Sequence, residues 1–175
     1  YREGGPIAKY KEDIQSLRDV VNVEQIPPVD VSNPAAGLAF KCYEGLWTSL
    51  PDFSTLQPVE QGITPEINLN ATARKEQFAL VFEGYAQAPA DGMYVFYCKS
   101  NDGSRLSVGG KVLIDNDGQH GEISKPGAIV LKAGFYPIRV EYFESGGSET
   151  LEVLVEGPGI ERQPVPATSL FHAGG

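Results

Sequence analysis

The sequence contains few of the residues on which catalytic centres usually depend. Its 175 residues include two histidines, two cysteines, one methionine and one tryptophan. His120 and His172 do not form the HExxH spacing of zinc proteases, and the chain has neither a Gly-x-Ser-x-Gly motif for acyl transfer nor a phosphate-binding loop. We therefore expect no catalytic activity. A small glycosidase stays open as an alternative, because glycoside hydrolysis needs only two suitably placed carboxyl groups.

Long apolar runs are also absent. No segment approaches the ~20 apolar residues that a membrane-spanning helix needs, and no basic and then apolar leader opens the sequence. The expectation is a protein that does not insert into membranes. Because the chain begins at Tyr1, we interpret it as a mature or excised module of a larger protein, and we expect that module to be monomeric.

Basic residues are outnumbered by acidic ones. Fourteen Lys and Arg stand against 23 Asp and Glu, which gives a formal net charge of -9 and a sequence pI near 4.7. This charge repels a phosphate backbone, so nucleic acid is not an expected partner. An acidic surface suits hard cations, which bind carboxylate, amide and carbonyl oxygens, and uncharged polar ligands such as sugars. A simpler interpretation is that most of these residues only keep the protein soluble.

The two cysteines, Cys42 and Cys98, both stand in apolar segments typical of strands. Such positions suit a disulfide formed in an oxidising compartment, and they suit a pair of buried thiols equally well. The sequence leaves both open, because it does not give the Cα separation that a disulfide requires.

Residues 1–35 differ from the rest of the chain and are predicted to be an extension and linker. They end in several prolines and contain one short helical pattern, whose apolar face comprises Ile14, Leu17, Val20 and Val21. A helix this short is unstable unless it packs on something, so we interpret the extension as the end of an upstream domain.

From Gly37 onward, apolar residues recur with the period of two that is typical of a half-buried strand. Gly, Pro, Asn or Asp bound each run, and the chain has 20 glycines and 13 prolines. This pattern predicts an all-β fold, an antiparallel β-sandwich over residues 36–172. The residues predicted to form its core are Phe78, Leu80, Phe82, Tyr94, Phe96, Ile138, Val140, Val153 and Val155.

Successive loops of such a sandwich alternate between its two ends if each connection joins antiparallel strands. The loops at 100–103, 116–127 and 143–149 then share one end, and the tight turns at 109–110 and 133–134 share the other. Functional residues concentrate on long loops over a rigid scaffold, so we expect the site at the first end. That end is acidic and carries Asp102, Asp115, Asn116, Asp117, His120, Glu122, Glu144 and Glu149.

Two loops at this end contain candidate ligands for a cation. Residues 99–106 have the Asn-Asp-Gly pattern of a plain hairpin, and Asn101 and Asp102 also offer the oxygens that Ca²⁺ prefers. Residues 115–121 are typical of Asx turns, and they also offer oxygen ligands on Asp115, Asn116 and Asp117. The second loop does not match a helix-loop-helix calcium site, because its spacing places a histidine where that site has glycine.

Trp47 is the only tryptophan and lies in a turn-rich stretch. An aromatic ring in such a place can stack on the C–H face of a sugar. A single tryptophan in a small domain is more often part of the core, so the residue has two interpretations.

The order of several motifs resembles one known family over residues 37–171. The motifs are Tyr43-Glu44-Gly45, Phe82-Glu83-Gly84-Tyr85, Asp91-Gly92-Met93-Tyr94-Val95-Phe96, Ser100-Asn101-Asp102-Gly103-Ser104-Arg105-Leu106, Ile114-Asp115-Asn116 and Tyr142-Phe143-Glu144-Ser145-Gly146-Gly147. Together they are similar to the lectin-like β-sandwich domain of the anthrax protective antigen fourteen-kilodalton type. That domain occurs in secreted bacterial glycosidases, adhesins and fungal flocculins.

The resemblance implies an extracytoplasmic module that binds a glycan or polysaccharide, accessory to a polysaccharide-processing protein such as a glycoside hydrolase. In the sugar-binding members, two aspartates joined by a cis peptide hold Ca²⁺, and the ion contacts vicinal sugar hydroxyls. Here Asn101 and Asp102 occupy those positions, so the site has one negative charge fewer. We expect the sugar to contact Asp102 and a rim of Gln119, His120 or Trp47. Some members bind no sugar, which keeps a structural spacer or a protein-interaction domain as the alternative.

Overall fold

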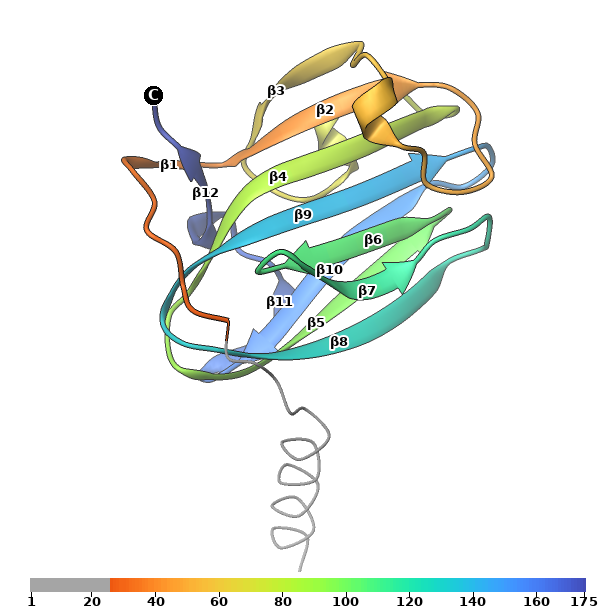
Figure 1. The fold of residues 1–175 in the computed structure, drawn as a ribbon. Coiled ribbons are helices and arrows are strands. Elements are labelled where there is room, and N and C mark those ends of the chain that lie inside the picture. The colour runs from red at the N-terminus through yellow and green to blue at the C-terminus, as the bar shows by residue number, and fades with distance from the viewer. Residues whose placement is uncertain (1–25) are drawn as a thin grey trace, which may run out of the picture.

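The computed structural model describes residues 26–175 and consists of two packed antiparallel sheets (Figure 1). The helical pattern predicted around Ile14 lies outside the described residues. The larger sheet has the order β1 (Pro34–Ala36), β12 (Leu170–Ala173), β4 (Phe78–Ala88), β9 (Gly134–Glu144), β6 (Ser104–Val108) and β7 (Lys111–Asn116), with β2 (Leu38–Glu44) on β4 and β3 (Glu60–Thr64) on β2. The smaller has the order β11 (Ile160–Pro164), β10 (Thr150–Gly157), β5 (Gly92–Asn101) and β8 (Ile123–Leu131). The predicted all-β sandwich is confirmed.

The core fills the space between the sheets, and the alternation of the strands decides which residues enter it. Every predicted core residue is buried, with no exposed fraction above 5%. Cys42 and Cys98 are buried free thiols, so the structure realises the second of the two alternatives for them. Burial raises the pKa of both thiols. Neither is placed to act as a nucleophile, because the thiolate is the reactive form.

The segment at Asn101–Gly103 is not the plain hairpin that its sequence suggested. β5 belongs to the smaller sheet and β6 to the larger one, so the turn carries the chain across the sandwich. The loop predicted at 116–127 is also shorter than expected, because β8 begins at Ile123 and pairs with β5 there. Asn116 Nδ2 donates to the Ile123 carbonyl oxygen at 2.9 Å, which stabilises this early start.

The loops alternate between the two ends of the sandwich as predicted. The connections at 45–59, 102–103, 117–122 and 145–149 lie at one end, on the right of Figure 1, which we call the loop end. The opposite end, the turn end, has short connections such as Gly109-Gly110, where φ values of 66° and 81° favour glycine. Two tyrosines close turns at this end. Tyr94 Oη donates to the Ala90 oxygen at 2.6 Å, and Tyr136 Oη donates to the Lys132 oxygen at 3.1 Å.

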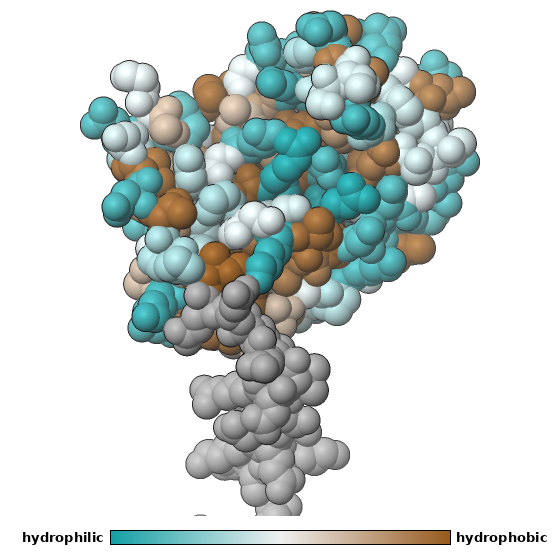
Figure 2. Space-filling model, viewed as in Figure 1, coloured by the Kyte–Doolittle hydropathy of each residue, from teal (hydrophilic) through white to brown (hydrophobic). Residues whose placement is uncertain are grey.

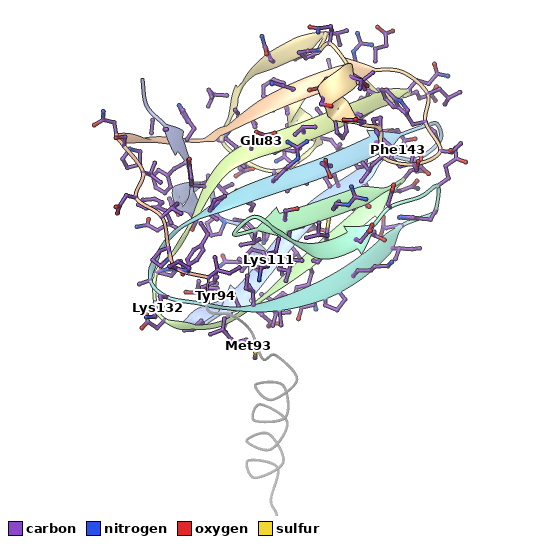
Figure 3. The ribbon with its side chains drawn as sticks, viewed as in Figure 1. Glu83, Met93, Tyr94, Lys111, Lys132 and Phe143 are labelled. Carbon is purple, nitrogen blue, oxygen red and sulfur yellow. The ribbon has the colours of Figure 1, made fainter. Side chains whose placement is uncertain are left out.

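A second apolar cluster lies on the outer face of the larger sheet, near the loop end. Phe143 and Tyr43 form its base, and the 45–56 connection, which includes the short 3-10 helix η1 (Phe53–Thr55), packs over them with Phe53 and Trp47 (Figure 3). Two further 3-10 helices, η2 (Leu69–Ala71) and η3 (Ala167–Ser169), lie in other connections. Across residues 26–175, the structure contains no helix with the length and apolar character needed to cross a membrane.

Candidate functional site

The turn between β5 and β6 places Asp102 at the centre of the loop end. The peptide bond between Asn101 and Asp102 is cis, and Asp102 is only 6% exposed. Its Oδ2 accepts hydrogen bonds from the Ser145 amide at 3.0 Å and from Ser145 Oγ at 2.9 Å. The Asn101 carbonyl oxygen accepts a hydrogen bond from Tyr142 Oη at 2.6 Å. Hydrogen bonds from β9 and from the β9–β10 loop therefore fix the position of this turn.

Asn116, at the end of β7, lies under this turn and is 1% exposed. Its Nδ2 donates to Ser100 Oγ at 3.2 Å and to the carbonyl oxygens of Ile123 and Cys98 at 2.9 and 3.4 Å. Its backbone pairs with that of Ser104. Asn116 is thus tied to Ser100 through its side-chain amide and to Ser104 through its backbone, one residue on each side of the Asn101–Gly103 turn. Its Oδ1 is the one buried side-chain oxygen or nitrogen among residues 26–175 that has no hydrogen-bond partner.

Glu144, the last residue of β9, is a second buried carboxyl group at this end. Its Oε1 accepts from the Gly146 amide at 2.8 Å, and its Oε2 accepts from Tyr142 Oη at 3.2 Å. Burial, followed by the negative charge of Asp102, raises the pKa of the Glu144 carboxyl to about 7. Burial also raises the pKa of the Tyr142 hydroxyl, with the charge of Glu144 as the next cause. The loop end therefore holds more negative charge than its surroundings compensate.

Asp115 and Asp117, predicted as cation ligands, already have partners of their own. Each has its Oδ2 3.8 Å from Arg105 Nη2, on the outer face of the larger sheet. Asp117 Oδ1 accepts from the Leu50 amide at 2.8 Å and from the Gly118 amide at 2.7 Å. The structure therefore places Asn116 beside the turn through Ser100, and it places Asp117 against the turn as well, because a Cβ on Gly103 would lie 2.9 Å from Asp117 Oδ1. The carboxylates of Asp115 and Asp117 are engaged by Arg105 and by backbone amides.

The predicted sugar-contacting residues differ in how available they are. Gln119 is exposed, and its Nε2 donates to Ser145 Oγ at 3.1 Å, which places it beside Asp102. Both ring nitrogens of His120 lie 2.7 Å from backbone oxygens, those of Gly121 and Asn116, so the ring closes its own loop. Trp47 is half-buried in the second cluster. A Cβ on Gly45 would come within 2.6 Å of the Trp47 ring, so the ring packs against that backbone.

Residues 66–169 match the PA14 domain family. The chain belongs to that family. Its curated relatives include the anti-sigma-I factor RsgI3 of Acetivibrio thermocellus, which is 23% identical over 80% of the chain, although the chain spans only 22% of that protein. The match supports the expected resemblance at the level of the PA14 family, and it points to no single member.

Two solved structures show the same fold. One is an anti-sigma factor domain-containing protein from Clostridium clariflavum, with a TM-score of 0.65 and 26% identity over 84% of this chain and 51% of that one. The other is a PA14 sugar-binding domain from an RTX adhesin, with a TM-score of 0.66 and 15% identity over 79% of this chain and 99% of that one. Nearly the whole of the adhesin domain is matched, which shows that the two chains share the sandwich fold.

The donor atoms of this PA14 site fit a hard cation. Within residues 26–175, no group of three or more His, Cys, Asp or Glu side chains is placed to hold a metal ion, so a cation here would need amide or carbonyl oxygens as well. What the described contacts place there is the Asp102 carboxylate and the unpartnered Asn116 Oδ1, with Asn101 joined to Asp102 by the cis peptide bond. Oxygen ligands of this kind, in irregular geometry, are those that Ca²⁺ accepts.

Residues of the β9–β10 loop complete the site, and the sequence reasoning did not assign them a role. Ser145 fixes the Asp102 carboxylate through two hydrogen bonds, and Glu144 adds a buried charge nearby. A signal for Glu144 was present in the sequence. It continues the series of inward-facing residues Ile138, Val140 and Tyr142, so the period of two points its side chain inward as well.

Proposed function

We propose that this PA14 module binds a glycan at the loop end, around a Ca²⁺ ion held by Asp102, Asn116 and Asn101. The observation that carries the proposal is the buried Asn116 Oδ1 without a donor. A buried polar atom left without a partner costs about 1–3 kcal/mol. A cation at that oxygen would remove the cost, because it replaces the missing donor.

The electrostatics of the loop end support the same proposal. Asp102 and Glu144 are both buried, and the charge of the first raises the pKa of the second. A divalent cation near Asp102 would offset this repulsion, and it would favour the ionised form of Glu144. Asp115 and Asp117 stay outside the proposed ligand set because Arg105 and backbone amides already engage them.

The ion, when bound, offers open coordination positions to sugar hydroxyls. The chain itself orients the site. Ser145 holds the Asp102 carboxylate, Tyr142 holds the Asn101 carbonyl oxygen, and the exposed Gln119 reaches over Ser145 as a hydrogen-bonding group at the rim. We expect Gln119 to contact the sugar. His120 fixes the conformation of its loop through contacts to two backbone oxygens, and Trp47 packs in the second apolar cluster, so neither is proposed to contact the sugar directly.

The named relatives suggest where such a module works. One solved relative is a sugar-binding domain of an adhesin, and the curated relative is a far longer anti-sigma-I factor. We propose an extracytoplasmic, non-catalytic module that gives a larger protein its affinity for a glycan. The alternatives are a spacer, which would bind neither Ca²⁺ nor sugar, and a small glycosidase, which would hydrolyse a chromogenic glycoside.

A glycan array probed with and without EDTA, together with titration calorimetry of Ca²⁺, tests the proposal. We expect Ca²⁺ binding and EDTA-sensitive glycan retention in the unmutated chain, and loss of both in Asp102→Ala. Asp115→Asn is the matched control, since it removes a neighbouring carboxylate outside the proposed set and should leave both intact. Absence of heat at millimolar Ca²⁺ would show that the cation part is wrong.

A further inference from the structure

A groove of about 540 Å³ crosses the outer face of the larger sheet, away from the loop end. The end of β12, with His172 and Ala173, lines one side, and the β6–β7 turn at Gly110 lines the other. Figure 2 views this face and shows hydrophilic residues interspersed with hydrophobic ones across the sheet. Glu83, labelled in Figure 3, lies on its floor.

The strand register explains the shape of the groove. One row across four strands pairs Ala39 with Glu83, Glu83 with Arg139, and Arg139 with Ser107. Small residues stand at both ends of the row and long charged ones in the middle. The next row toward the turn end pairs Tyr85 with Pro137. The floor therefore combines small residues, a half-buried aromatic ring and an ion pair.

The groups on this floor match an uncharged, hydroxyl-rich ligand. The charged side chains that line the groove, Glu83 and Arg139, form an ion pair with each other, so the floor carries balanced charge and offers no uncompensated charge to an ionic ligand. Ser107 and the Glu83–Arg139 pair offer donors and acceptors to hydroxyls. His172 contacts the Gly37 oxygen at 3.0 Å through Nδ1, which leaves Nε2 as the ring nitrogen available to a ligand. The Tyr85 ring offers an apolar surface for the C–H face of a pyranose.

We propose that this groove is a second glycan-binding surface, which takes a segment of an uncharged polysaccharide chain. A peptide adding as a strand fits less well, because β12, β4, β9 and β6 are all paired on both sides and offer no free backbone edge. Arg139 is the residue of β9 that lines the groove nearest the loop end, and it lies five positions before Glu144, about 17 Å of strand. The groove is thus distinct from the loop end and stands without Ca²⁺.

Affinity electrophoresis of the full chain in EDTA tests the groove separately from the cation site. The gels contain soluble β-glucan, xylan, galactomannan or polygalacturonate. We expect retardation by at least one neutral polysaccharide and none by polygalacturonate. Ser107→Trp, which fills the groove from the outer face, should weaken that retardation about tenfold or more, and Tyr85→Leu should weaken it as well. Ser124→Trp, on the outer face of the smaller sheet, is the control and should behave as wild type.

The outcomes separate this proposal from the loop-end function. Asp102→Ala should leave the EDTA-resistant retardation unchanged, so either site can fail alone. No retardation in EDTA by any of the four polysaccharides would overturn the proposal. Equal retardation of the wild type and of Ser107→Trp would overturn it too, provided that Ser107→Trp keeps the melting temperature of the wild type. If the wild type binds peptides from a displayed peptide library and Ser107→Trp does not, the ligand of the groove is a peptide and the glycan proposal is wrong. Dimerisation lost in Ser107→Trp, measured by sedimentation, would assign it to a second copy.

Discussion

The two ends of the sandwich are built from the same strands and differ in how completely their polar atoms are bonded. At the turn end, Tyr94 and Tyr136 each bond to both backbone groups of the residue four positions earlier. At the loop end, Asn116 Oδ1 has no hydrogen-bond partner. Asp102 and Glu144 are both buried there, and the negative charge of Asp102 raises the pKa of Glu144. The comparison indicates that the turn end stabilises the fold, while the loop end retains unsatisfied groups that a ligand can complete.

The largest expected effect is at the turn end. Tyr136→Ala removes a fully buried ring and the hydroxyl that bonds to Lys132. Truncations of buried aromatic residues cost about 3–5 kcal/mol. Urea unfolding should show this loss equally with Ca²⁺ and with EDTA. A cost that changed with Ca²⁺ would break the division of roles between the two ends.

The second effect is a pH dependence at the loop end. The Glu144 pKa is about 7 in the folded protein, above its ordinary value of 4.5, so the folded state binds the proton more tightly. The contribution of Glu144 to stability is then greatest below about pH 4.5 and is lost as pH rises toward 7, by on the order of 3 kcal/mol. Glu144→Gln should remove this fall and be the more stable protein at pH 8 in EDTA. Parallel urea midpoints of the two proteins from pH 4 to 8 would contradict the assignment.

A matched pair of hydroxyl deletions gives a smaller effect. Tyr94→Phe and Tyr142→Phe each lose a buried hydroxyl, at a cost of about 1–2 kcal/mol. Tyr142 holds the Asn101 carbonyl oxygen, whereas Tyr94 bonds only to Ala90. Calorimetry should therefore show weaker Ca²⁺ binding for Tyr142→Phe alone. Equal Ca²⁺ affinity in the two variants would remove Tyr142 from the site.

The smallest effect concerns the residue at which this chain departs from the paired aspartates of its family. Asn101→Asp adds a carboxylate beside Asp102 and near Glu144. In EDTA the variant should be less stable by under about 1 kcal/mol, and in Ca²⁺ it should bind the ion more tightly, by roughly tenfold. Melting temperatures in EDTA and in Ca²⁺ should therefore shift in opposite directions. A shift in the same direction would argue against a cation at this turn.

The sequence predicted most of the fold, because alternation along strands such as β4, β5 and β9 states directly which side chains enter the core. The same alternation also assigns the candidate site residues of β7 to the inner or the outer face of the sheet. Ile114 and Asn116 face inward, so Asp115 and Asp117 face the outer surface, where Arg105 lies. The prediction of all three as ligands was made from their closeness in sequence, without this period of two, and it stays a prediction.

Other features of the site depend on contacts that no local pattern contains. The Asn-Asp-Gly turn looked like a hairpin because its residues favour one, and only the partners of β5 and β6 show that it joins two sheets. Ser145 meets Asp102 across 43 positions of sequence. The unpartnered state of Asn116 Oδ1 likewise reflects the placement of every neighbouring donor. Such facts follow from the three-dimensional arrangement alone.

The pairing of β1 with β12 has a mechanical consequence. Pro34 pairs with Ala173 and Ala36 with Phe171, so β1 and β12 form one short antiparallel ladder at the edge of the larger sheet (Figure 1). The chain is held a second time before this ladder, because the Val29 amide donates to the Phe135 carbonyl oxygen at 2.9 Å and Ile26 packs against the core. Tension applied through the N-terminal side would therefore load the contacts of Ile26 and Val29 before it reached the hydrogen bonds between β1 and β12. We expect these contacts and the β1–β12 ladder to detach at lower force than the β4–β9 ladder, which is eleven residue pairs long.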